Sequence, residues 1–257
     1  VLTEPGRGPA LQAYLQHNIF FNDEARIADL AGQTHQFVLH GPVAGAVMTQ
    51  MDAALAGLPV FGGAAVTLAE TPIYAARIKP VSVDAWALIV PRDRAAQVWT
   101  ALLALGASEG LRPAGSLIYN MLRIRAGRPA AHAELTDAFI PLELGLWDEV
   151  SFSKGCYTGQ EIIARMESRG RLARTIVRLR LSAAQTAPLD LVAGGRSAGT
   201  LTSSVTTPDG EHLGIGVVRL AHAQAGVQLQ AGETTATVID LAGVQPPGLR
   251  EENGQDS

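Results

Sequence analysis

The sequence predicts a domain of mixed helices and strands, of the α/β or α+β class, followed by a small β-barrel or sandwich. The chain has 257 residues, near the size at which one hydrophobic core begins to split into two. Strand-like and helical patterns alternate up to Ala126, whereas short strand-like runs follow one another after Arg174 with almost no helical periodicity. We therefore place a domain boundary near Leu172.

Helices and strands of the first part are predicted from apolar spacing and from the turn residues that bound each pattern. Apolar residues recur at helical spacing from Val43 to Leu55, with Pro42 before the first and Gly57 after the last. The other predicted helices cover residues 11–15, 92–105 and 113–126. The predicted extended segments cover residues 25–39, interrupted by Gly32, and the β-branched or apolar runs 63–70 and 85–91.

The second part is predicted to be all β. Its strand-like runs are separated by turn residues, an arrangement typical of a small barrel or sandwich. These runs cover residues 174–181, 198–205, 213–220, 226–232 and 234–241. We expect a first domain over residues 1–172 and the barrel over residues 173–245. Because residues 246–257 are polar and contain prolines, we expect a disordered tail there.

Composition excludes several classes of protein. The formal net charge of −4 argues against strong nucleic-acid binding. No apolar run approaches the roughly 18 residues of a membrane span, and the opening VLTEPGRGPA lacks the regions of a signal peptide, so we expect a cytoplasmic protein that does not bind membranes. One cysteine rules out an internal disulfide framework, and the six histidines are too scattered to predict a metal site.

The arginines are distributed unevenly. Of the 18 arginines, ten lie between Arg112 and Arg180, and six of those lie from Arg165 onward. This basic stretch suits a small anionic ligand or a short anionic tail, and an RNA-contacting surface is a further hypothesis. The alternative is a solvated arginine face, and charge alone does not choose between them.

The only cysteine lies in the octet KGCYTGQE, residues 154–161. The run QEIIARMES, residues 160–168, has a helical apolar stripe, so Cys156 is predicted to lie just before a helix that Thr158 or Gly159 caps. The helix N-terminus and the nearby Lys154 both favour a thiolate, as in reactive cysteines. The alternative is a buried cysteine that packs as a small hydrophobe.

A second candidate pair lies on the predicted helix over residues 113–126. Tyr119 and Arg123 are one turn apart, and an aromatic ring next to arginines can bind a flat, anionic heterocycle by stacking and by cation–π contact. The alternative is a tyrosine that packs at the edge of a core.

The octet, followed by IIARMESRGRLAR and preceded by LRIRAGRP and FIPLELGLWDEVSFS, resembles the YgfZ family of folate-binding proteins. That family is related to the aminomethyltransferase T-protein of the glycine cleavage system, and the match covers roughly residues 19–241. The resemblance implies an α+β fold: a GcvT-like folate-binding domain followed by a small C-terminal β-barrel. It also implies a tetrahydrofolate-binding accessory protein for iron–sulfur cluster assembly or maintenance, which affects tRNA modification by iron–sulfur enzymes.

The resemblance also implies roles for individual residues. Tyr119 matches an aromatic that stacks on the folate, Cys156 matches the characteristic thiol, and Arg174 matches a basic position that we expect to contact the glutamate tail. The partners implied are a folate and iron–sulfur enzymes or their assembly proteins. The expected catalytic residues are Cys156 and Lys154, and the expected folate-binding residues are Tyr119, Arg123, Tyr157, Gln160 and Arg174.

Two features depart from the family pattern. Relatives usually have a pterin-binding carboxylate where this chain has Arg125, which cannot accept a hydrogen bond. The family's first segment has no counterpart before Leu11, so we expect a fragment or a shortened product in which the folate domain is incomplete at its N-terminus. The alternative function is a true aminomethyltransferase, although T-proteins generally lack the cysteine of the octet.

Overall fold

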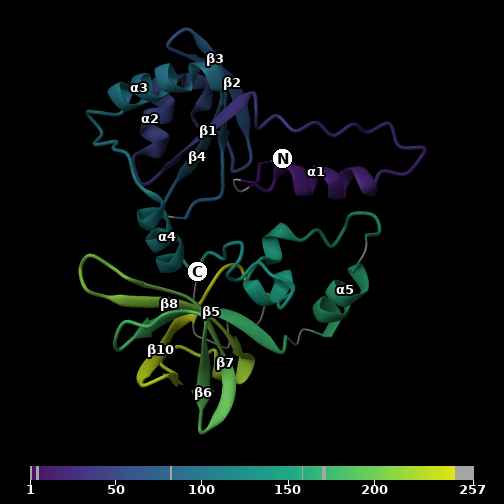
Figure 1. Cartoon of the computed structure of the whole chain (residues 1–257), viewed down its shortest axis with the longest axis vertical. Helices are drawn as coiled ribbons and strands as arrows, with labels where there is room; N and C mark the ends of the chain where they lie inside the picture. Colours follow the sequence, from purple (N-terminus) through teal and green to yellow (C-terminus); the bar gives the residue numbers. More distant parts are fainter. Residues whose placement is uncertain (1, 4–5, 82, 158, 170–171, 247–257) are drawn as a thin grey trace. The chain divides into compact units, whose positions relative to one another are not determined.

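The computed structural model describes residues 2–3, 6–81, 83–157, 159–169 and 172–246, and its contacts divide the chain into two compact units (Figure 1). The first unit covers residues 1–113 and the second covers residues 114–257. The predicted α+β fold with a C-terminal barrel is confirmed. Leu172, where composition predicts a boundary, lies within the second unit just before the barrel, and residues 247–257 of the predicted tail lie outside the described residues.

The first unit is built on a four-stranded antiparallel sheet with strand order β1-β4-β3-β2. Its core packs one face of this sheet against two helices, with Val47, Val98 and Leu102 from the helices against Leu39 and Leu88 from the strands. The strands are β1 (Thr34–His40), β2 (Gly63–Leu68), β3 (Thr71–Arg77) and β4 (Ala85–Pro91), and the helices are α1 (Gly8–His17), α2 (Ala44–Met51) and α3 (Ala95–Leu105).

This unit differs from the sequence predictions in several details. The helix predicted through Leu55 ends at Met51, because Asp52 is extended and its carboxylate accepts the N–H of Ala54 at 2.9 Å, which starts a separate short turn. Strand β3 was not predicted, since Pro72 interrupts its pattern. The region from residue 25 is regular strand only from Thr34 onward.

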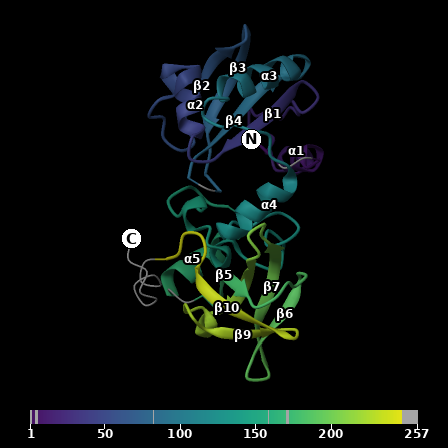
Figure 2. The same cartoon turned by 90° about the vertical axis from the view of Figure 1, so that its left-hand side faces the viewer.

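The second unit contains a closed barrel with strand order β10-β5-β8-β7-β6-β9 (Figure 2). Leucines from four of its strands, Leu179, Leu191, Leu201 and Leu229, are almost completely buried inside it. The short strand β6 was not predicted. The barrel strands are β5 (Arg174–Leu181), β6 (Leu189–Ala193), β7 (Arg196–Thr206), β8 (His212–Arg219), β9 (Gln228–Ala231) and β10 (Thr234–Leu241).

Two helices of the second unit carry three of the predicted site residues, Tyr119, Arg123 and Gln160. Helix α4 (Ser116–Arg125) packs against the outside of the barrel, where Ile124 joins a cluster with Ile176 and Ile215. Helix α5 (Gln160–Arg169) begins within the cysteine octet, four residues after Cys156, and its Ile163 packs with Leu142 from a preceding short helical turn. The predicted helices at these positions are confirmed.

A close backbone contact connects the segment before the octet to the end of the barrel. Gly145 has a left-handed φ of 67°, and its carbonyl accepts the N–H of Val244 at 2.8 Å. A Cβ at this glycine would lie 2.5 Å from the carbonyl oxygen of Ala242, closer than real Cβ atoms approach backbone.

Replacing this glycine therefore tests the contact. Gly145→Ala should lower the free energy of unfolding by about 3 kcal/mol, because it adds a steric clash to an unfavourable φ. Gly226→Ala is the matched control, since Gly226 also has a positive φ (83°) but no heavy atom beyond its two chain neighbours lies within 4 Å of the position that its Cβ would take. The control should lower the free energy of unfolding by only about 1 kcal/mol. Urea denaturation measures both values. Equal losses of unfolding free energy in the two variants would show that the close approach of Gly145 to Ala242 does not restrict the residue at position 145.

Candidate functional site

The octet places its cysteine at the surface. Cys156 is exposed, so the alternative of a buried cysteine packed as a small hydrophobe is wrong. The ammonium of Lys154 lies over the ring of Tyr157, 4.6 Å from the ring centroid. The N–H of Tyr157 donates to Oε1 of Gln160 at 3.3 Å, and Gln160 is the first residue of α5. The structure thus gathers three of the predicted residues next to an accessible thiol.

The start of α5 agrees with the sequence prediction in position. The predicted cap Thr158 lies outside the described residues, and Gly159 has a φ of 90°. The side chain of Gln160 satisfies the N–H of Tyr157 three residues before it. An exposed thiol in such a turn can reach a macromolecular partner or a small electrophile, which a buried one cannot.

Tyr119 and Arg123 lie one turn apart on α4 but differ in exposure. The side chain of Tyr119 is half-exposed (46%), so its ring has a face on which a planar ligand can stack. Arg123 is buried (8% exposed).

The guanidinium of Arg123 belongs to a buried network. It donates to Asn120 at 2.8 Å, to Glu134 at 3.2 Å and to the hydroxyl of Ser203 at 2.9 Å. Glu134 is completely buried, and its oxygens also accept the hydroxyls of Thr202 and Ser203, at 2.7 and 2.6 Å, and the N–H of Ala130 at 3.0 Å. Arg123 therefore connects α4 to strand β7 of the barrel.

Arg174, at the start of β5, is paired with Glu143. Its guanidinium donates to both carboxylate oxygens, at 3.1 and 3.0 Å, and to the carbonyl of Ala138 at 3.0 Å. It also lies over the ring of Phe139, 5.0 Å from the centroid. Its side chain remains 40% exposed, so a ligand can still approach it.

Sequence reasoning missed the carboxylates that hold these two arginines. Glu143 gave no capping-box signal, because the residue three positions before it is Ile140 rather than Ser or Thr, although its carboxylate accepts the N–H of Ile140 at 3.3 Å. Glu134 gave no local signal either, since its hydroxyl partners Thr202 and Ser203 lie 68 and 69 residues further along the chain.

The described part of the chain also bears on metals and membranes. Within it, no three His, Cys, Asp or Glu side chains are grouped closely enough to hold a metal ion. Its helices are all too short or too polar to cross a bilayer.

The network around Glu134 predicts a large loss of stability on mutation. Glu134→Gln should lower the free energy of unfolding by about 3 kcal/mol or more, because a buried guanidinium then lacks its counter-charge. Glu149→Gln is the control, since its 3.2 Å pair with Arg128 lies near the surface and should contribute less than about 1 kcal/mol. Urea denaturation measures the free energy of unfolding of both variants. Similar small decreases in the two variants would contradict a structural role for the buried pair.

The chain matches two known domain families. The model of the GCVT N-terminal domain matches residues 2–154, and that of the CAF17 C-terminal beta-barrel domain matches residues 171–243.

Similar proteins include two whose names state a transferase activity. A chloroplastic Arabidopsis thaliana protein, provisionally named a transferase, is 33% identical over 93% of this chain and 56% of its own length. An aminomethyltransferase of Streptomyces coelicolor is 29% identical over 87% of this chain and 60% of its own length. The chain thus spans little more than half the length of these relatives.

A solved structure shows the same fold. The glycine cleavage system aminomethyltransferase T of Bartonella henselae superposes with a TM-score of 0.72 at 22% identity, over 91% of this chain and 65% of that one.

Proposed function

The chain belongs to the family of the GCVT N-terminal domain, and we propose that it binds tetrahydrofolate and acts as an accessory protein in iron–sulfur cluster assembly or maintenance. The observation that carries this proposal is the exposed thiol of Cys156 in an octet of YgfZ type, on a chain whose C-terminal part matches the CAF17 barrel. A cluster needs about four thiolate ligands. One cysteine can supply a single ligand, or its thiolate can take the outer sulfur of another protein's persulfide, which leaves as a thiolate. The remaining ligands of a cluster come from an iron–sulfur enzyme or an assembly protein.

The residues present fit a folate in part. Tyr119 has an exposed ring for stacking on a pterin, and Arg174 is exposed enough to attract a glutamate carboxylate. Tyr157 and Gln160 lie together beside Cys156, so they form a second place for contact in our proposal. Arg123 fits poorly as a direct ligand because its donors are taken by neighbouring groups. We assign it the role of holding α4, and hence Tyr119, on the barrel.

The consequence for the cell follows from the client enzymes. Iron–sulfur-dependent tRNA modification should fall when the protein is absent. We propose that the protein is located in the cytoplasm, and cell fractionation tests this. The name of the similar Arabidopsis protein places that protein in the chloroplast.

An aminomethyltransferase is the second candidate, because the Streptomyces coelicolor relative carries that name. The cysteine of the octet argues against it, since T-proteins generally lack it. An assay for transfer of a methylene group from a lipoyl-bound aminomethyl group to tetrahydrofolate decides between them, and rapid turnover would favour the enzyme.

Folate binding is tested by titration with tetrahydrofolate. Tyr119→Ala should weaken binding about tenfold, because the variant loses the stacking surface. Tyr74→Ala is a matched control, since Tyr74 on β3 is also 46% exposed, and its affinity should equal that of the wild type. Equal affinities of all three proteins, measured calorimetrically without oxygen, would remove the role of Tyr119, and no binding at all would remove the folate proposal.

The role of the thiol is tested in a strain that lacks the gene. Cys156→Ser should restore only a small part of the activity of iron–sulfur enzymes and of their tRNA modification, because a hydroxyl neither binds iron as thiolate does nor carries sulfur. Ser153→Ala changes an exposed neighbour of the octet and should restore both fully. With equal protein levels, full restoration by Cys156→Ser would mean that the sulfur has no chemical role.

A further inference from the structure

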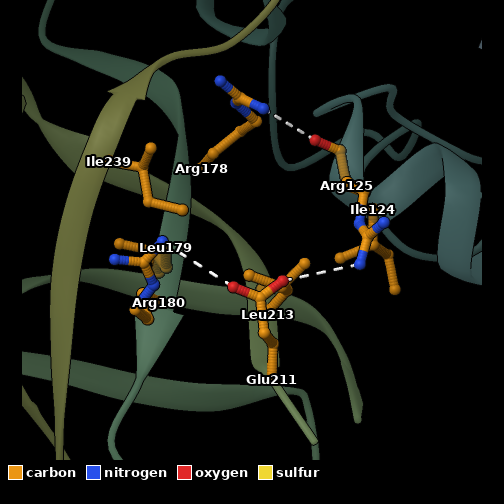
Figure 3. A pocket seen from close by; sticks show the side chains of 9 residues that line it. Ile124, Arg125, Arg178, Leu179, Arg180, Glu211, Leu213 and Ile239 are labelled. Atoms are coloured by element: carbon orange, nitrogen blue, oxygen red, sulfur yellow. Dashed lines mark hydrogen bonds and ion pairs between the residues drawn. The ribbon is translucent and has the colours of Figure 1, made fainter. Parts of the chain in front are cut away.

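A pocket of about 300 Å³ lies on the outside of the barrel, next to the C-terminal end of α4 (Figure 3). Its apolar floor includes Ile124 from α4, Leu213 from β8 and Ile239 from β10. All of its lining residues belong to the second unit, so the pocket is formed by one compact part of the chain. The volume is at the lower end of the range of small-molecule sites.

Arg178 forms a fixed wall of this pocket. Its guanidinium makes a bidentate pair with Asp240 and donates to the backbone carbonyl of Arg125 at 2.8 Å. The hydrogen bond to Asp240 is the main reason that the pKa of Arg178 is raised. A side chain held in this way gives the pocket its shape.

The other two arginines of the rim are held more loosely. Figure 3 shows the carboxylate of Glu211 between Arg125 and Arg180. The nitrogen–oxygen distances are 3.4 Å to Arg125 and 3.8 Å to Arg180, longer than the 2.7–2.9 Å typical of charge-assisted hydrogen bonds. Arg125 also lies 3.5 Å from Asp209, whose pKa is lowered chiefly by a hydrogen bond from Thr207.

These pairs are easy to replace. The side chains of Arg125, Arg180 and Glu211 are 45, 64 and 42% exposed, so water screens their attraction. A ligand anion that is free to move can approach the donors of both arginines more closely than the tethered carboxylate of Glu211 does. Its contacts with the two arginines would then be shorter.

We propose that this pocket binds a small molecule with an apolar body and one anionic group, a carboxylate or a phosphate monoester. The body lies on the floor of Ile124, Leu213 and Ile239, and the anion takes the place of the Glu211 carboxylate between Arg125 and Arg180. Glu211 then acts as an internal competitor that weakens binding of anions. The inference does not depend on the proposed folate binding.

Titration of the full chain followed by amide NMR tests the site. The probes are phenyl phosphate and benzoate, with phenol and inorganic phosphate as partial ligands, and none of them contains a pterin. We expect phenyl phosphate or benzoate, whichever matches the natural anion, to shift the amide signals of Arg180, Leu213 and Gly214 saturably. Phenol and inorganic phosphate should bind about tenfold more weakly, because each lacks one of the two features. Absence of saturable shifts at these residues with both anionic probes, or equal binding of phenol, would overturn the proposal.

Three variants separate this site from general attraction of anions. Glu211→Gln should bind the preferred probe about threefold more tightly, because the competing surface pair is removed. Arg180→Gln should bind it about tenfold more weakly, since one charge-assisted contact is lost. Arg196→Gln removes the same charge from an exposed position on β7 outside the pocket and should leave binding unchanged. Unchanged or weaker binding by Glu211→Gln, with an unaltered melting temperature, would show that Glu211 is no competitor and contradict the proposed anion position.

Discussion

The second unit depends on one buried ion pair, between Arg123 on α4 and Glu134. A carboxylate without contact to water is costly unless each oxygen is well hydrogen-bonded. Here one oxygen accepts the hydroxyls of Thr202 and Ser203, and the other accepts the guanidinium of Arg123 and a backbone N–H. Because these partners come from a helix, a loop and a barrel strand, they can all be satisfied only in one arrangement of the three elements.

This arrangement orients both proposed binding sites. Tyr119 lies one turn before Arg123 on α4, and Arg125 lies two residues after it. Fixing Arg123 on the barrel therefore determines where the exposed ring of Tyr119 points and where Arg125 meets Glu211. A residue that touches neither ligand can thus influence both sites by holding the helix that carries their contacts.

The sequence predicted the elements whose signals are local. Periodicity located the helices and most barrel strands, and the turn-to-helix pattern located α5 shortly after Cys156. Strand β3 was missed because Pro72 breaks its pattern. Which arginines pair with a carboxylate was not predictable, because their partners are distant in the sequence. Glu143 lies 31 residues from Arg174, and Asp240 lies 62 residues from Arg178. Spacing along a chain contains no information about such pairs, and it also left open whether Cys156 is exposed or buried, which the structure decides.

The pairing changes how the basic stretch after the octet should be understood. A charge count from the sequence suits RNA or an anionic tail, yet Arg174 and Arg178 each hold a carboxylate through two hydrogen bonds. A guanidinium paired in this way adds little field at a distance, because the carboxylate cancels its charge, and it releases few counterions when a phosphate approaches. Attraction of anions from a distance then depends mainly on arginines with long, exposed pairs, such as Arg125 and Arg180. Two such side chains beside an apolar floor suit a single small anionic group better than a phosphate backbone, which needs a line of unpaired cations.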